Sequence, residues 1–370
     1  MPSTLRAPIS DCQPQRNCGR GAASWRPTLP ARISDRQPAR MMNMRLSLLL
    51  LAILPALAES PSDRIGTIDF YGYGHLDLPS LRTALPLKEG DPVPSDAVRD
   101  SALQAVSRVA GRKAVLSKIC CLEDGRRSIF IGLPEVGAPP LTFNPAPQGD
   151  AKLPADAVRM FQKLDNDLMA AVKKGKARED DSLGYALVED PAAHADQLKL
   201  RDWARTHLAT VLKVLAESRD SEQRANAAEA LGYADRSPQQ IAALVTAAFD
   251  SDGDVRNNAV RALEVLCTLG AEITKQIPAT RFIPLLHSIE WTDRNKGAYL
   301  LMAMTASRDP ALLKLLHDQA LEPLREMAQW KDFSHAWPSL TILGRIGGIE
   351  EDRLNRLNPS MVPEILRASQ

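Results

Sequence analysis

Residues 64–134 carry a hydrophobic pattern that mixes strand and helix periods. Ile68 and Phe70 alternate with their neighbours, and this period of two is typical of a half-buried strand. An Asp-Gly pair ending at Gly125 gives the turn signal of a hairpin. The pattern predicts a strand, two helices and two strands, over residues 67–71, 79–85, 95–109, 115–122 and 129–133. This order indicates a small α+β domain over 64–134.

Residues 134–154 break this pattern, because they contain six prolines. Proline lacks a backbone N–H and favours extended chain, so such a segment is semi-rigid. The segment therefore marks a domain boundary. It is either a linker, over 135–154, or a strap laid along the following domain.

From residue 155 to residue 370 the pattern is helical, and part of it repeats. Residues 225–231 match 257–263 at an offset of 32. At an offset of 39, Pro284-Leu285 matches Pro323-Leu324, and Trp291-Thr292-Asp293 matches Trp330-Lys331-Asp332. One helix pair cannot bury its apolar face alone, whereas stacked pairs build a continuous core. The core positions predicted from the offsets are Ala227, Leu231, Ala259, Leu263, Ala298 and Met302.

Residues 250–263 resemble a HEAT repeat. They combine an Asp-rich turn, the Val255-Arg256 pair and a helix rich in Ala and Leu. The resemblance covers residues 200–350, although Asn295 and Ser334 stand in the place of the arginine in the last two units. It implies a mainly α fold, an α-helical solenoid. Because HEAT proteins are mostly scaffolds with an elongated concave surface, it also implies a protein-binding function.

The small domain resembles a POTRA domain, the polypeptide-transport-associated module of outer-membrane assembly and secretion proteins. The likeness rests on Ile68-Asp69-Phe70-Tyr71-Gly72, on Leu81 and Leu85, and on Leu87-Lys88-Glu89-Gly90-Asp91. No series of barrel-like strands follows, so the resemblance implies a fold and not membrane insertion. Such a sheet can accept a partner strand at its edge. The alternative is that the domain only caps the solenoid.

A secretory signal peptide is predicted at residues 41–58. Arg45 supplies the positive charge, residues 46–57 are apolar, and Ala56-Leu57-Ala58 is an A-x-A cleavage site. The apolar run is shorter than the ~20 residues that span a bilayer. Residues 1–40, with seven Arg and six Pro, are either an over-extended start or a disordered basic tail. We therefore expect an exported protein, periplasmic or secreted.

Removing residues 1–58 changes the sign of the net charge. The whole chain carries +1, with 46 Lys and Arg against 45 Asp and Glu. The mature chain keeps 38 and 43 of these, which leaves about −5. This balance gives no electrostatic reason to expect a nucleic-acid partner. We expect a protein partner in the cell envelope or outside the cell.

Two sets of residues are candidates for binding that partner. One is a mildly basic strip on the second helices of the repeats, which line the concave side of such solenoids. Its alternative is solvated surface, or Arg bridging acidic turns. The other is a ridge of two tryptophans before turns, whose alternative is packing between repeats. The candidates are Arg224, Arg256, Asn257, Arg261, Trp291 and Trp330, with Arg294 and Lys296 extending the strip.

Residues 250–254 suggest a calcium site, because they hold three aspartates at alternate positions. An EF-hand loop, however, needs Gly at its sixth position and Glu at its twelfth, where this chain has Val255 and Arg261. We interpret the acids as part of a turn. The sequence also lacks the common catalytic and nucleotide-binding motifs. It therefore predicts no metal, no cofactor and no enzyme.

The mature chain keeps three cysteines. Cys120 and Cys121 are adjacent, so they form either a strained vicinal disulfide or one buried and one exposed thiol. Cys267 lies in an apolar helix and is predicted to be core. An alternative function depends on it, because some HEAT-like proteins that this one resembles handle tetrapyrroles. A small-ligand-binding or lyase-like protein of that kind would need a deep pocket reaching Cys267.

The export prediction is tested by N-terminal sequencing of the natively expressed protein. Signal peptidase cuts after an A-x-A motif, so the mature chain should begin at Glu59. A mature product that still contains residues 1–40 would contradict both the cleavage site and the over-extended start.

Overall fold

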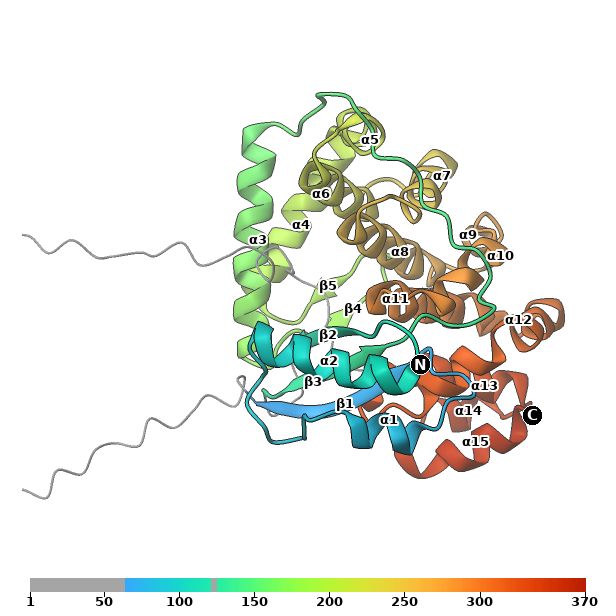
Figure 1. Ribbon diagram of the computed structural model, residues 1–370. Helices are drawn as coiled ribbons and strands as arrows, with labels where there is room; N and C mark the ends of the chain where they lie inside the picture. Colours follow the sequence, from blue (N-terminus) through green and yellow to red (C-terminus); the bar gives the residue numbers. More distant parts are fainter. Residues whose placement is uncertain (1–63, 121–124) are drawn as a thin grey trace, which may run out of the picture.

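The computed structural model describes residues 64–120 and 125–370 (Figure 1). In chain order the elements are β1 (Ile65–Tyr71), α1 (Leu78–Ala84), α2 (Asp96–Ala110), β2 (Val115–Cys120), β3 (Arg127–Gly132), α3 (Ala155–Lys173), β4 (Glu179–Asp180), β5 (Leu187–Val188), α4 (Pro191–Thr206), α5 (Leu208–Glu217), α6 (Ser221–Gly232), α7 (Pro238–Ala247), α8 (Gly253–Cys267), α9 (Ala271–Thr274), α10 (Ala279–Phe282), η3 (Ile283–His287), α11 (Trp291–Met304), η4 (Thr305–Ser307), α12 (Pro310–Ala328), α13 (Phe333–Ile346), α14 (Glu351–Leu354), η5 (Pro359–Met361) and α15 (Val362–Ala368). The basic tail, the signal peptide and the pairing of Cys120 with Cys121 lie outside the described residues.

The small domain has the order strand, helix, helix, strand, strand that the sequence pattern predicts. Its central strand, β3, runs parallel to β1 and antiparallel to β2. The helices α1 and α2 cover one face, where Ile129 and Ile131 pack in one core with Val106. Tyr71 and Phe130, on the other face, belong to the core of the helical repeats. The sheet is therefore buried on both faces and joins the small domain to the rest of the chain.

Four helix pairs follow the long helices α3 and α4. In each pair an outer helix leads through a turn into an inner one: α5 into α6, α7 into α8, η3 into α11, and α12 into α13. The inner helices stack in that order, and the outer helices lie on the rim of the molecule (Figure 1). The chain is thus mostly an α-helical solenoid. No helix in the described part of the chain is long and apolar enough to cross a membrane.

Aspartates at the turns fix where the inner helices begin. The Asp220 carboxylate accepts hydrogen bonds from the first-turn amides of α6, and Asp252 does the same for α8. Such a cap satisfies amides that have no partner within the helix, and it contributes about 1 kcal/mol. Asp220 and Asp252 are therefore the N-caps of α6 and α8.

The core positions predicted from the repeat offsets are all buried. Ala227, Leu231, Ala259, Leu263 and Ala298 are 0% exposed, and Met302 is 6% exposed. The offset of 39 nevertheless fails for the tryptophans, which do not end equivalent helices. Trp291 is the first residue of α11, whereas Trp330 lies in the turn before α13.

The proline-rich segment is a strap along the turns of the repeats (Figure 1). The amide of Asn144 donates to the carbonyl of Phe249 after α7, over 2.6 Å. The amide of Gly149 donates to the carbonyl of Glu217 at the end of α5, over 2.9 Å. Strap residues 144 and 149 thus meet the turns of neighbouring repeats, and the segment is part of the folded unit.

The stacked core predicts a strong effect of truncating Leu263. Leu263→Ala should lower the free energy of unfolding by about 2–5 kcal/mol, because it leaves a cavity between inner helices. Chemical denaturation measures the change. The matched control is Leu183→Ala, since Leu183 is 58% exposed. The control should stay within about 0.5 kcal/mol of wild type, and an equally small effect at Leu263 would show that the register is wrong.

Candidate functional site

Arg224, a predicted contact for a partner, lies inside the protein. Its Nε and Nη2 atoms each donate to the carboxylate of Asp250 over 2.8 Å. Its Nη1 atom donates to the carbonyl of Ser218, in the turn before α6, over 2.9 Å. Because Asp250 belongs to the next turn of the solenoid, this side chain ties one repeat to the following one.

Arg256 repeats this arrangement on α8. Its Nε and Nη2 atoms donate to the carboxylate of Asp293 over 2.8 and 3.1 Å. Its Nη1 atom donates to the carbonyl of Asp250 over 3.0 Å, again six residues before the arginine. On its outer side the guanidinium centre lies 3.8 Å from the ring centroid of Phe143 in the strap. Arg224 and Arg256 therefore make the same kind of contact between successive repeats.

Arg294 takes the third place, where the sequence offset had put Asn295. Its Nε atom donates to the carbonyl of Ser288, six residues earlier, over 2.6 Å. Its Nη2 atom donates to the carboxylate of Glu135, at the start of the strap, over 3.0 Å. We call Arg224, Arg256 and Arg294 the arginine ladder.

The arginine ladder holds the repeats together and offers no surface to a partner. Arg224, Arg256 and Arg294 are 1%, 4% and 0% exposed. A buried guanidinium is tolerated only when carboxylates and carbonyls satisfy its donors, as they do for Arg224 and Arg256. The alternative interpretation of the basic strip, arginines that bridge acidic turns, describes Arg224 and Arg256. The prediction that Arg224 and Arg256 contact an external partner is therefore wrong, because both side chains are buried.

Asn257 and Arg261 lie further along α8. The Asn257 amide donates to the side chain of Asn258 over 3.2 Å. Arg261 is half-buried and pairs with the carboxylate of Glu179 in β4. Burial raises the pKa of Glu179, against the opposing charges of Arg261 and Lys296. This part of the predicted strip is therefore a site of mixed charge on the inner helices.

The hairpin formed by β4 and β5 covers part of the inner helices. The hydroxyl of Tyr233, after α6, donates to the carbonyl of Ala186 over 2.7 Å. The hydroxyl of Thr268, after α8, donates to the carbonyl of Asp181 over 3.1 Å. The hairpin thus covers part of the inner helices and leaves a smaller area of them exposed.

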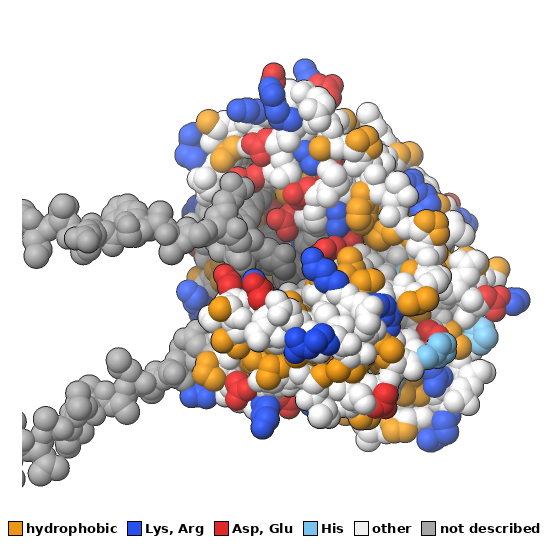
Figure 2. All heavy atoms as spheres, in the orientation of Figure 1, with side chains coloured by type: hydrophobic (Ala, Val, Ile, Leu, Met, Phe, Trp, Pro, Cys, Tyr) orange, Lys and Arg blue, Asp and Glu red, His pale blue; other side chains and the backbone are white. Residues whose placement is uncertain are grey.

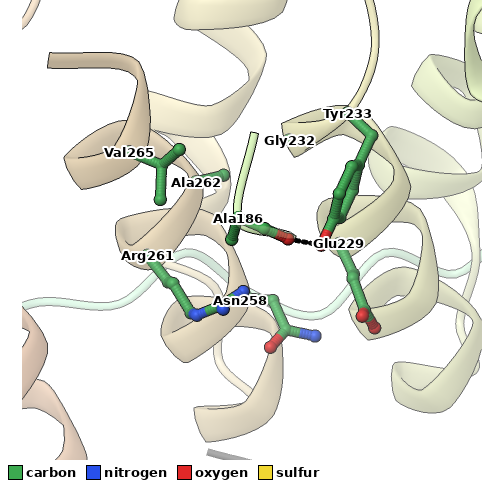
Figure 3. Close-up of a pocket in the computed structure, with 8 residues that line it drawn as sticks. All are labelled: Ala186, Glu229, Gly232, Tyr233, Asn258, Arg261, Ala262 and Val265. Carbon is green, nitrogen blue, oxygen red and sulfur yellow. Dashed lines mark hydrogen bonds between the residues drawn. The ribbon is translucent and has the colours of Figure 1, made fainter. Parts of the chain in front are cut away.

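A small recess lies between this hairpin and helices α6 and α8 (Figure 3). It is lined by Ala186, Glu229, Gly232, Tyr233, Asn258, Arg261, Ala262 and Val265. Its volume of about 20 Å³ gives room for one water molecule, whereas small-molecule pockets measure about 300–1,000 Å³. The polar ends of Glu229, Asn258 and Arg261 lie together on one side of it in Figure 3. The recess has the size of a hydration site.

Trp291 and Trp330 lie beneath the small domain. The ring of Phe130, from β3, packs with its centroid 4.9 Å from that of Trp291 and 4.8 Å from that of Trp330. The indole Nε1 of Trp330 donates to the carbonyl of Phe70 over 3.0 Å. The two side chains are 1% and 5% exposed. They form the seat of the chain's own small domain, so the predicted ridge for an external partner is absent from the surface.

Three carboxylates at this interface are missing from the candidates drawn from the sequence. The first is Asp69 in β1, which is 1% exposed. It accepts hydrogen bonds from the amide of Lys331 over 3.0 Å and from that of Asp332 over 3.2 Å. These amides precede α13, so the small domain supplies the acceptor for the turn that leads into this helix.

The second carboxylate is Glu326, near the end of α12. It accepts hydrogen bonds from the amides of Gly72 and Gly74 over 2.5 and 2.7 Å. Gly72 has a φ of +69°, and a Cβ atom there would lie 2.0 Å from the carbonyl oxygen of Leu133. Burial raises the pKa of Glu326, and the charge of Arg294 works against the rise. This contact requires glycine at position 72.

The third carboxylate, Glu135, joins the strap to the third repeat. It lies 2.9 Å from Nδ1 of His287 and 3.0 Å from Nη2 of Arg294. Burial tends to raise its pKa, but the hydrogen bonds and charges of these two partners outweigh burial and hold the pKa below its usual value. The strap is therefore anchored at the arginine ladder.

Cys267 is buried among apolar residues, as predicted. Burial raises the pKa of its thiol to about 12, so the reactive thiolate is strongly disfavoured. Cys267 does not line the recess. Within residues 64–120 and 125–370, no group of three or more His, Cys, Asp or Glu side chains is arranged to hold a metal ion. In the Asp-rich turn, Asp250 is bound by Arg224 and Asp252 caps α8.

Comparison with known proteins supports the assignment of the repeats. Residues 208–277, from α5 to just beyond α9, match HEAT repeats. An engineered protein is 20% identical, with 48% of this chain and 80% of the other covered and a TM-score of 0.34. A computationally designed armadillo repeat protein for modular peptide recognition is 17% identical, with 57% and 97% covered and a TM-score of 0.37. TM-scores this low do not establish a shared fold. No curated protein matches the chain.

Removing one member of the arginine ladder should destabilise the protein strongly. Arg224→Met leaves Asp250 buried without its cation and should lower the free energy of unfolding by about 3–5 kcal/mol. Denaturant unfolding followed by circular dichroism measures this change. Arg353→Met removes an exposed pair with Glu364 and serves as the control, with no shift in midpoint expected. Equal midpoints for the two variants would contradict the structural role of the arginine ladder.

Proposed function

We propose that this protein is an exported, non-enzymatic scaffold that binds a protein partner with its helical repeats. The observation that carries the proposal is the stack of helix pairs whose residues 208–277 match HEAT repeats. A solenoid exposes a large surface for its volume and presents side chains from several repeats to one partner. Such a function needs an extended surface and no cluster of reactive groups.

The surface proposed for the partner is the inner side of the solenoid around Asn257 and Arg261. Both residues lie on α8, in the middle of the stack. Figure 2 shows acidic and basic side chains close together on the face between the repeats and the small domain. The fork of donors on Arg261 suits carboxylates and carbonyl oxygens of a polypeptide. Arg224, Arg256, Trp291 and Trp330 are buried and Asn257 is 9% exposed, so Arg261, with 17% of its side chain exposed beside Glu179, is the strongest remaining candidate.

The small domain offers a second contact in this proposal. Among the described residues, its strand β2 pairs only with β3 and lies at an edge of the sheet. An extended segment of a partner can pair with such an edge through main-chain hydrogen bonds. The POTRA-like order of strands and helices supports this role.

Export rests on the sequence of residues 41–58. The arrangement of a positive residue, an apolar run and a small-residue cleavage site supports a secretory signal. We therefore place the partner in the cell envelope or outside the cell. Neither the size of the recess nor the surroundings of Cys267 favours the small-ligand alternative.

The proposal is tested by affinity capture from envelope extracts with matched variants. Arg261→Gln removes one charge from the proposed surface while keeping a long polar side chain. It should reduce recovery of the captured partner at least tenfold. Lys213→Gln makes a comparable change at an exposed position of the outer helix α5 and should leave recovery unchanged. Circular dichroism verifies that both variants fold.

Two outcomes would contradict this assignment. Equal capture by the folded Arg261→Gln variant would show that the partner does not bind at α8. If a variant that blocks strand pairing at the edge of β2 then loses capture, the partner binds the small domain. Turnover of a small substrate by the purified protein would overturn the non-enzymatic scaffold.

A further inference from the structure

Asp69 is a buried carboxylate without a neutralising ion pair. It is 1% exposed, and its hydrogen bonds come from the backbone amides of Lys331 and Asp332. Two cations of this region bind other groups: Lys331 Nζ pairs with Glu89, and Arg82 Nη1 donates to the carbonyl of Ile68 over 3.2 Å. Among the described residues, no cation lies within ion-pair distance of the Asp69 carboxylate. Its charge is therefore held mainly by backbone dipoles.

A second buried carboxylate, Asp332, lies beside it. Asp332 is 5% exposed, and its own backbone amide donates to Asp69. Its carboxylate accepts hydrogen bonds from the hydroxyls of Ser128 and Ser334, and Nε2 of His335 lies 3.7 Å away. Two carboxylates buried together repel each other, so protonation of one relieves both repulsion and the loss of hydration.

The charged and titratable groups around Asp69 come from four parts of the chain. They are Tyr73 after β1, Arg82 on α1, Glu89 in the loop after it, and Lys331, Asp332 and His335 at the start of α13, where Lys331 pairs with Glu89 and His335 lies beside Asp332. Burial and the charge of Asp332 favour a neutral carboxyl at Asp69, and the charge of Arg82 opposes it.

We propose that the contact between the small domain and α13 is a pH-sensitive lock in which Asp69 takes up a proton, so that the small domain is held more tightly in mild acid than above neutral pH. A protonated carboxyl still accepts the amides of Lys331 and Asp332 through its carbonyl oxygen. It also no longer repels Asp332. The hydrogen bonds that seat the domain therefore survive protonation while the electrostatic cost falls.

The direction of the effect follows from proton linkage. Burial raises the pKa of Asp69 to about 6, and the charge of Asp332 adds to the rise, while the two amides and Arg82 work against it. In the open chain the pKa returns to about 3.9. The closed state therefore binds the proton more tightly, and its extra stability is present below pH 6 and lost as pH rises through 6. Between pH 5 and pH 8 the opening constant should rise about tenfold.

Native-state hydrogen exchange at the amides of Lys331 and Asp332 tests the lock in the full chain. Wild type and Asp69→Asn are compared at the same pH, so that the intrinsic pH dependence of exchange and of other groups such as His335 cancels. The ratio of opening constants, wild type over variant, should rise about tenfold from pH 5 to pH 8. Asp100→Asn, at an exposed position of α2, is the matched control and should give a constant ratio.

A constant ratio for Asp69→Asn would overturn the proposal, because it would mean that Asp69 does not titrate in this range. If the variant fails to fold, a carbon-13 titration of the Asp69 carboxyl in wild type decides the matter. A midpoint near pH 6 supports the lock, and a midpoint below about pH 4.5 overturns it.

Discussion

The buried pair between an arginine of one repeat and an aspartate of the next is the contact on which the architecture depends. A guanidinium cannot be left inside a protein without partners, since an unpaired buried charge costs several kcal/mol. Arg224 therefore requires Asp250 in one position, and Arg256 requires Asp293. Apolar helices alone can slide past one another, but these pairs fix which turn lies against which. The strap then seals them, with Phe143 packed over Arg256.

The last repeat lacks this arginine and uses the small domain in its place. Arg224, Arg256 and Arg294 each lie four residues after the N-cap of their helix, and α13 has Ala336 at that position. Asp69 instead binds the amides before α13, and Phe130 fills the space between the tryptophans. The two parts of the chain are therefore one cooperative unit. The strap and the sheet therefore cover surfaces that the repeats alone would leave open.

The sequence predicts the elements well and the contacts between distant elements poorly. Alternation and helical spacing are local, so the strands and the buried Leu263 follow from them directly. Repetition also brings out Arg224 and Arg256, but it cannot tell whether they face solvent, because that depends on Asp250 and Asp293 from later turns. The predicted repeat offset is wrong at the third repeat. The spacing from Arg256 to Arg294 is one residue shorter than the offset between the two tryptophans. Asp69 carries no local signal, since its partners are backbone amides.

The apolar face of the sheet that carries Tyr71 and Phe130 affects how the chain folds. Phe70 and Trp330 bond across 260 residues of sequence, so the sheet remains uncovered until the last repeats are in place. Contacts this distant are slow to form, because the entropy of closing the intervening chain is lost before they are gained. The small domain is synthesised before the repeats, so Phe130 and Tyr71 stay exposed to other chains until the last repeats fold.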